Sequence, residues 1–282
     1  MRWSNTILLL FALVAHTAVA ELTFTVEATQ KGAPIPKSEI KLEPLESDSD
    51  HMHLGRPAPP PSQTNGVVRR SNPTANSANW CGAVNTTPSS NPIKTIHGVF
   101  QHPTCSQRAG ITTYPQAAAN WVGIDGDSWT SALLQAGTVC KIDNSTGVVR
   151  NEAWWQWVPS ASYTISSMPV SADDWFEVTI ETTSSTQATI TLTNLSTLTT
   201  YTITITSGPH LARLNADWVV ERPYYGSTLA PFASFTDVWF DEAWASRTGA
   251  ADMGMTGAKQ YQIVGLCASQ EWSAAEGVSW SL

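Results

Sequence analysis

The strongest constraint on the fold is a series of short stretches in which apolar and polar residues alternate. In the stretch Asp174–Thr182, Phe176, Val178 and Ile180 alternate with glutamate and threonine. Such alternation predicts half-buried β-strands. It recurs in residues 188–193, 201–206 and 234–240, and shorter strands are expected at 79–84, 95–101, 260–266 and 278–282. Because no long run has apolar residues at helical spacing, we expect an all-β protein, an antiparallel two-sheet β-sandwich.

The first 20 residues have the organisation of a secretory signal peptide. Arg2 supplies the positive start, residues 7–14 form a short apolar core, and Ala18–Ala20 is a small-residue cleavage site. The apolar run is too short to span a bilayer, and an uncleaved hydrophobic strand is the alternative. We expect a secreted, extracellular protein that is cut after Ala20 and has no membrane anchor.

Residues 21–70 differ in composition from residues 71–282. They contain no tryptophan or cysteine and are rich in proline, serine, glutamate and lysine. Such a composition favours extended or disordered chain, so we expect a largely disordered propeptide. The dibasic pair Arg69–Arg70 at its end is a natural processing site. A linker that stays attached is the alternative interpretation.

Residues 71–282 suit one domain. This part has eight basic and sixteen acidic residues, a formal net charge of −8, and no basic patch. The charge argues against a nucleic-acid partner. Three asparagines stand in glycan acceptor motifs: Asn85, Asn144 and Asn194.

The four cysteines are Cys81, Cys105, Cys140 and Cys267. In an oxidising compartment they allow two disulfides with three connectivities, and the sequence does not choose among these. No cysteine pair has metal-ligand spacing, and His97 and His102 are expected to be edge or loop residues. We therefore expect neither a metal site nor a cofactor.

Residues 153–159 hold three tryptophans in seven positions. In a strand, Trp155 and Trp157 share one face, and Trp154 and Gln156 share the other. One face can enter the core. The other needs a second layer or a ligand, unless both faces are buried in the fold.

The usual hydrolase motifs are missing from the chain. It has no GxSxG elbow, no HExxH and no pair of Asp-Thr/Ser-Gly segments. Carboxylate and amide chemistry is what remains.

Six segments bear on that chemistry. They are Asn79–Val84 (NWCGAV), Trp121–Asp127 (WVGIDGD), Ala132–Gly137 (ALLQAG), Ala153–Pro159 (AWWQWVP), Asn215–Glu221 (NADWVVE) and Pro231–Phe235 (PFASF). In this order, across essentially all of residues 76–245, the chain resembles the glutamic peptidases, or eqolisins, secreted acid endopeptidases chiefly of fungi. The resemblance implies a concanavalin-like sandwich of two large antiparallel sheets, with the active site on the concave face.

The resemblance makes Gln135 and Glu221 the catalytic pair. Amide hydrolysis needs a base for water, a donor for the oxyanion and an acid for the leaving nitrogen, and one carboxylate can be base and then acid. Glu221 would have both roles, and Gln135 would position the water and stabilise the oxyanion. A glutamate with the ordinary pKa of about 4.3 stays partly ionised in mild acid, so an acidic optimum would result. Taken alone, Gln135 reads as a buried amide and Glu221 as an exposed partner of Arg222.

Further residues match family positions that frame or tune the site: Trp80, Gly82, Trp121, Asp125, Gly126 and Trp154. The alternative for the tryptophans is core packing. For Asp125 it is a turn cap helped by Gly126, and Asp127 reads as a turn residue.

The chain departs from the better-known members at several positions. Ser128–Thr130 replaces their Thr-Cys-Glu, so their disulfide there is absent. Val139 and Asp217 replace Asp and Glu, and Gln156 and Val158 replace Glu and Tyr. These changes spare the catalytic pair but leave subsite preference, pH profile and disulfide pattern open.

Two other function classes compete with a peptidase. Tryptophan-rich grooves on β-sandwiches bind sugars, and a glycosidase could use Glu221 with Asp125; a lectin-like or cell-wall binding module is the second. The family places an amide opposite Glu221, and a binding module has less need of a masking leader. We therefore predict a secreted, monomeric acid endopeptidase acting on protein or peptide substrates, inhibited by residues 21–70 until they are removed.

Overall fold

The computed structural model describes residues 22–44, 52–53, 72–271 and 278–281. These ranges are almost entirely β-structure, and the helical element in them is a 3-10 turn at Lys37–Glu39. The expected signal peptide with Ala20 and the dibasic pair Arg69–Arg70 lie outside the described residues.

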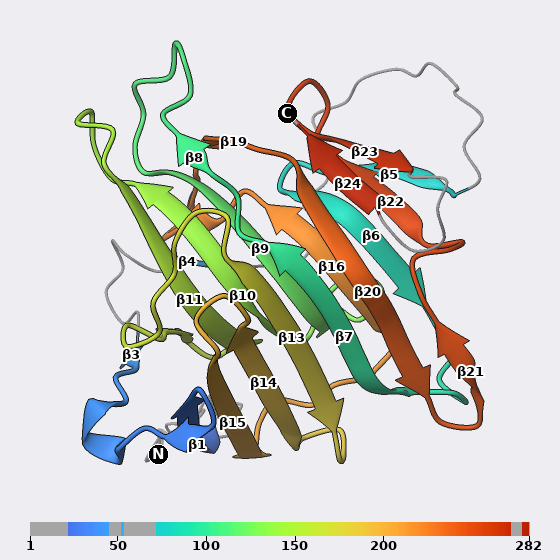
Figure 1. The fold of residues 1–282 in the computed structure, drawn as a ribbon. Helices are drawn as coiled ribbons and strands as arrows, with labels where there is room; N and C mark the ends of the chain where they lie inside the picture. The colour runs from blue at the N-terminus through green and yellow to red at the C-terminus, as the bar shows by residue number, and fades with distance from the viewer. Residues whose placement is uncertain (1–21, 45–51, 54–71, 272–277, 282) are drawn as a thin grey trace, which may run out of the picture.

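Two large sheets form the molecule (Figure 1). We call the ten-stranded sheet the back sheet and the nine-stranded sheet the front sheet; in the view of Figure 1 the back sheet lies nearer the viewer. The strand order of the back sheet is β2 (Ala33–Pro34), β1 (Thr23–Gln30), β15 (Thr199–Ser207), β14 (Ala188–Asn194), β13 (Trp175–Thr182), β7 (Ile93–Gln101), β20 (Val238–Arg247), β24 (Val278–Ser281) and β23 (Ala268–Glu271), with β21 (Ala250–Met253) paired to β20.

The front sheet has nine strands. Their order is β3 (Glu43–Pro44), β12 (Ser162–Thr164), β11 (Val149–Val158), β10 (Leu133–Ile142), β9 (Gln116–Asp125), β16 (Asn215–Glu221), β6 (Trp80–Thr86), β22 (Lys259–Gln262) and β5 (Thr74–Asn76). Two small sheets join β18 (Thr228–Leu229), β17 (Tyr224–Tyr225) and β4 (Met52–His53), and β19 (Ser234–Phe235) with β8 (Cys105–Ser106). In the large sheets every pairing is antiparallel except that of β22 with β5. The predicted antiparallel sandwich is confirmed.

The core lies between the two sheets. Alternate residues of the long central strands enter it, as Phe176, Val178 and Ile180 of β13 do. Trp218 of β16 reaches across the layer, and its Nε1 donates to the His97 carbonyl of β7 at 2.8 Å. A Cβ at position 98 would lie 2.9 Å from Cδ1 of this indole, so the neighbouring strand needs glycine there.

Two predicted strands have different bounds from those expected. The alternating stretch 234–240 is split, because β19 pairs with β8 and β20 with β7. Similarly, β22 ends at Gln262, where the chain turns and Ile263 N donates to the Cys267 carbonyl.

The tryptophan-rich strand β11 is buried on both faces. Trp155 and Trp157 enter the core between the sheets, whereas Trp154 belongs to a second apolar cluster on the opposite side of the front sheet. Gln156 shares that side and is 3% exposed. Of the two arrangements left open by the sequence, burial of both faces is the one observed.

The leader segment is ordered where the sequence predicted disorder. Residues 23–30 form β1, which adds to the edge of the back sheet by pairing along its whole length with β15. Phe24 packs edge-on against Trp155 and Tyr163, with ring centroids 4.9 and 5.0 Å away. The expectation was therefore wrong for residues 22–44: composition hid a short alternating strand whose apolar side chains have a core to enter.

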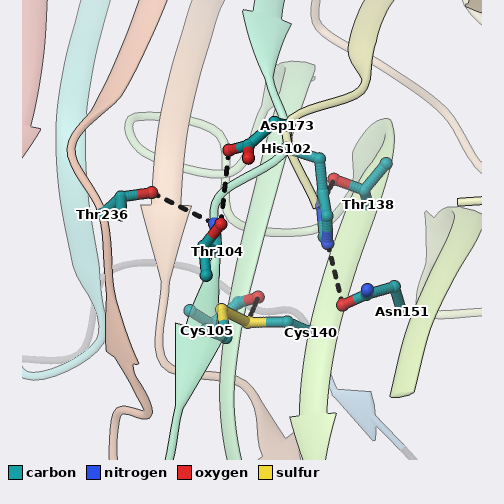
Figure 2. The surroundings of a disulfide bond; sticks show 9 residues. His102, Thr104, Cys105, Thr138, Cys140, Asn151, Asp173 and Thr236 are labelled. Atoms are coloured by element: carbon teal, nitrogen blue, oxygen red, sulfur yellow. Dashed lines mark hydrogen bonds between the residues drawn. A yellow bond between two sulfur atoms is a disulfide. The ribbon is translucent and has the colours of Figure 1, made fainter. Parts of the chain in front are cut away.

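The four cysteines form two disulfides, Cys81–Cys267 and Cys105–Cys140. Figure 2 shows the second beside His102, which is fully buried. The His102 ring nitrogens lie 2.8 Å from Thr138 Oγ1 and 3.0 Å from Asn151 Oδ1. His102 lies in the irregular segment that follows β7, as expected for a loop residue. His97 differs from expectation, since it lies in the central strand β7 and is only 6% exposed.

Candidate active site

Gln135 and Glu221 lie on the same face of the front sheet. Gln135 is in β10 and Glu221 in β16, with β9 between these strands. Their chain neighbours Leu134 and Val220 enter the core between the sheets. Because successive side chains of a strand alternate, Gln135 and Glu221 project from the opposite side, which we call the outer face.

Glu221 is fully buried, and both of its oxygens accept hydrogen bonds. Asn79 Nδ2 donates to Oε1 at 3.0 Å, and Trp121 Nε1 donates to Oε2 at 2.9 Å. Arg222 has other partners, since its Nε donates to the Ala230 carbonyl at 3.0 Å. An exposed ion pair with Arg222 is therefore the wrong interpretation of Glu221.

Gln135 is also fully buried. Its Nε2 donates to the side-chain oxygen Oε1 of Gln156 at 3.2 Å. Gln156 lies directly across the β10–β11 ladder.

Three tryptophans from different strands surround the pair on the outer face. Trp80, Trp121 and Trp154 are at most 1% exposed. Trp80 packs edge-on against Trp121 with ring centroids 5.0 Å apart. Within the described part of the chain, Nε1 of Trp80 and Nε1 of Trp154 have no acceptor. The outer face thus combines apolar area with N–H donors that a polar ligand could use.

Asp125 is committed to the backbone. Its Oδ2 accepts from Arg213 N at 2.8 Å, and its Oδ1 from Leu214 N at 2.7 Å and Asn215 N at 3.3 Å. Burial raises the pKa of the Asp125 carboxyl, and these backbone N–H groups partly offset that rise. The contacts make Asp125 a cap that fixes the start of β16, a segment far along the chain, and not a cap of its own turn.

Both expected site glycines are required by geometry. A Cβ at Gly82 would come 2.2 Å from the Trp218 carbonyl oxygen of the adjacent strand. Gly126 has φ 107°, a backbone conformation that side chains disfavour, and it lies beside Trp80 and Leu133. Both glycines shape the frame of the site.

Asp217 is a site-face residue that sequence reasoning missed. It is fully buried on β16, on the same face as Glu221, and neither carboxyl oxygen has a hydrogen-bond partner among the described residues. Burial raises the pKa of Asp217 well above its ordinary range, with further contributions from Asp125 and Asp127. Asp127 itself accepts hydrogen bonds from Lys259 and Tyr261.

Asn79 and Gln156 were also missed as hydrogen-bond partners of Glu221 and Gln135. Asn79 directly precedes Trp80 in a segment that the sequence singled out, but its contact with β16 depends on a pairing far along the chain. Gln156 could have been found from the hairpin register alone, because it faces Gln135 across the ladder.

The expected glycan acceptors differ in surroundings. Asn194 is fully buried, and its Nδ2 donates to Pro169 O and Asp174 Oδ2, which excludes a glycan there in this fold. Asn85 Nδ2 donates to the Gly254 carbonyl at 2.7 Å, whereas Asn144 is exposed.

Two kinds of feature are absent from the described residues. No helix in them is long and apolar enough to cross a membrane. No group of three or more histidine, cysteine, aspartate or glutamate side chains in them could hold a metal ion.

Two curated proteins are similar to part of this chain. Aspergillopepsin-2 of Aspergillus niger is 37% identical over 135 residues, which cover 47% of this chain and 47% of that protein. Scytalidopepsin B of Scytalidium lignicola is 33% identical over 128 residues, covering 43% and 47%. The chain therefore spans about half the length of the curated relatives it matches.

Solved structures share the fold over a longer range. Scytalido-glutamic peptidase with a transition-state analogue inhibitor has a TM-score of 0.62 at 24% identity, covering 72% of this chain and 98% of that one. The same peptidase with a peptide-based transition-state analogue has a TM-score of 0.60 at 25% identity, with the same coverage. A model of the peptidase A4 family matches residues 78–279. That match covers most of the chain and includes both β10 and β16, so the chain belongs to the peptidase A4 family, the glutamic peptidases or eqolisins.

Proposed function

We propose that this protein is a secreted acid endopeptidase in which Glu221 and Gln135 activate water against a peptide bond. The observation that carries the proposal is the Glu221 carboxylate, buried on the outer face and held by N–H donors on both oxygens. These donors orient the carboxylate and stabilise its charge, as a fixed general base requires. Family membership and the peptide-based analogue bound to a structural relative support a peptide as substrate.

The chemistry needs these two side chains and one water molecule. Glu221 removes a proton from water while the oxygen attacks the carbonyl carbon, and the carbonyl π electrons move to the oxygen. Gln135 Nε2–H donates to that oxyanion. The protonated Glu221 then gives its proton to the amide nitrogen as the C–N bond breaks, which leaves a free acid, a free amine and an ionised Glu221.

A glycosidase is less well supported by the same geometry. It would need two carboxyl groups flanking one bond. Asp125 was the candidate partner of Glu221, but its oxygens accept from the backbone N–H groups of residues 213–215.

Residues 21–70, the leader, support the idea that the protein is made as an inactive precursor whose site is covered. Both members of the catalytic pair are fully buried in a chain that still carries residues 21–70. Met52–His53 pair with Tyr224–Tyr225, and Tyr225 belongs to the apolar cluster of the outer face. We infer that the leader holds the site closed until it is cut after Arg70. Purified precursor with full activity in acid would contradict this inference.

The test of the proposed function is cleavage of an unfolded protein between pH 2 and 7, with pepstatin present to silence ordinary aspartic proteases. We expect activity at the acid end from the mature chain. Because removing one oxyanion donor costs about 10²- to 10³-fold, Gln135→Ala should lose at least that, and Glu221→Gln should lose more. Folded variants that both keep wild-type activity would overturn the assignment.

A further inference from the structure

We propose that Gln156 is a positioning residue of the catalytic site, which determines which end of the Gln135 amide faces the reacting peptide bond. The inference rests on the proposed function. It adds that the Gln156 side chain orients the Gln135 amide. Gln156 stands where the better-known family members have glutamate, so the assignment concerns a feature particular to this chain.

The two glutamines form a chain of hydrogen bonds between adjacent strands, which we call the relay. Gln135 of β10 and Gln156 of β11 are directly opposite in the ladder. Gln135 Nε2 donates to Gln156 Oε1 at 3.2 Å, and Gln156 Nε2 donates to the backbone carbonyl of Ser160 at 3.1 Å. Gln135 and Gln156 are 0% and 3% exposed, so water is a poor substitute for these partners.

The direction of the relay is set at the Ser160 end. A backbone carbonyl can only accept, whereas the two ends of a glutamine amide have almost the same shape and opposite hydrogen-bonding character. Reversing Gln156 would place its carbonyl oxygen against the Ser160 carbonyl oxygen and leave a buried NH2 group facing Gln135. The observed orientation avoids both conflicts, and it requires Gln135 to present Nε2, not Oε1, to Gln156.

This orientation matters for the reaction. The Gln135 NH2 group has two hydrogens; one is given to Gln156, and the second is the donor that the proposed mechanism directs at the oxyanion. If the amide turned over, a carbonyl oxygen would face the developing negative charge. A displacement of about 1 Å in such a group can already cost about 10²-fold in rate. Because Gln156 is an amide, it can donate and accept at every pH.

The first variant is Gln156→Met, which keeps the length of the side chain and removes both hydrogen bonds. We expect kcat to fall about 10- to 100-fold with KM within a factor of about two, because orientation of a catalytic group is lost while the substrate contacts remain. Gln187→Met is the matched control. Gln187 Nε2 also donates to a backbone carbonyl, that of Thr206 at 3.2 Å, but it lies in a turn of the back sheet. We expect it to keep wild-type kcat.

The second variant, Gln156→Glu, separates positioning from packing. A protonated glutamate can donate to Ser160 O and accept from Gln135, whereas an ionised one can only accept. Activity relative to wild type should therefore be near one at pH 3 and fall as pH rises towards 6. If Gln156 had only a structural role, the substitution would change stability, and the ratio of variant to wild-type activity would not change with pH. The variant also keeps the test available if Gln156→Met does not fold.

The outcomes distinguish the two proposals. A folded Gln156→Met with wild-type kcat, or a Gln156→Glu whose activity ratio does not change with pH, would overturn the positioning role while Gln135→Ala still abolishes cleavage. If Gln135→Ala and Glu221→Gln both remain active, the proposed function itself fails. A fall in kcat of Gln156→Met, together with the pH-dependent ratio in Gln156→Glu, supports the relay.

Discussion

The two faces of the front sheet use the same strands for different purposes. The inner face packs against the back sheet with residues such as Val122, Leu134 and Trp218. The outer face buries Gln135, Asp217 and Glu221 just as completely. Burying polar groups is costly unless they are paired, and Asp217 has no hydrogen-bond partner in the described part of the chain. The inner face thus buries apolar side chains, as a stable core requires. The outer face buries amide and carboxyl side chains at the place where catalysis is proposed.

The two sides of the sheet also respond to acid in opposite ways. On the inner side, burial lowers the pKa of His102, so this ring takes up a proton at lower pH in the folded protein than in the unfolded chain. On the outer face, burial raises the pKa of Asp217, so this carboxyl keeps its proton to higher pH in the folded protein than in the unfolded chain. His102 makes the fold less stable in acid, whereas Asp217 makes it less stable as pH rises. The comparison yields three predictions, given from the largest expected effect to the smallest.

The largest effect comes from exchanging one tryptophan on each face for phenylalanine. Trp121→Phe removes the N–H donated to Glu221, and hydrogen bonds to charged groups are worth about 1.5–3 kcal/mol. Peptidase activity should therefore fall about 10- to 100-fold. Trp218→Phe removes the N–H donated to His97 O and leaves a cavity between the sheets. It should lower the free energy of unfolding by about 2–3 kcal/mol and leave the activity of the folded molecules near wild type.

Urea unfolding and steady-state kinetics on both variants check this contrast. The proposed difference between the faces would be contradicted if the activity of Trp218→Phe fell by more than its loss of folded protein explains. It would also be contradicted if Trp121→Phe were fully active. Either result would mean that the two faces do not divide stability and catalysis between them.

The architecture followed from local patterns, while the site needed contacts between distant segments. Alternation over Asp174–Thr182 marks a strand because period two is a property of the chain itself. By contrast, the contact of Asn79 with Glu221 depends on the pairing of β6 with β16, which lie far apart in the sequence. The leader shows the converse error: proline and charge made residues 22–44 look disordered, although Phe24 and Ala28 have a core to enter. Composition reports only the average burial expected of a segment. It therefore does not detect one short strand that pairs with the edge of an existing sheet.

The second prediction concerns Asp217→Asn and the pH dependence of stability. Above pH 4 the unfolded chain releases the Asp217 proton, whereas the folded protein retains it because its pKa is raised. The stability that Asp217 contributes is therefore fully present below about pH 4 and is lost as pH rises towards its folded pKa. Asn cannot ionise, so the variant should gain stability relative to wild type between pH 3 and 7. The slope is about 1.4 kcal/mol for each pH unit over which the two states differ by one proton.

Urea titrations at intervals between pH 3 and 7 measure this difference. Asp252→Asn, at an exposed carboxyl of the back sheet, is the matched control for removing a carboxylate. A difference between Asp217→Asn and wild type that does not change with pH would show that Asp217 ionises alike in the folded and unfolded chain.

The smallest effect is expected from His102→Gln, on the inner side of the sheet. The folded pKa of His102 is lowered by burial, with Asn151, Asp174 and Asp173 opposing the shift, so the unfolded chain takes up the proton first as pH falls. The stability it contributes is present above the unfolded pKa of about 6.5 and is lost as pH falls towards the folded pKa. Gln cannot take up a proton. At pH 8 the variant should be less stable by about 1 kcal/mol, because the fit to Thr138 and Asn151 is poorer.

Below pH 6 that deficit should shrink, because wild type loses stability there and the variant does not. Thermal unfolding of both proteins from pH 3 to 8 at fixed ionic strength tracks the change, with His210→Gln as an exposed control. A deficit that stays constant over this range would mean that His102 is protonated alike in the folded and unfolded chain. A deficit that shrinks in acid, alongside the opposite trend at Asp217, would show that the pH of greatest stability is set by competition between the two sides of one sheet.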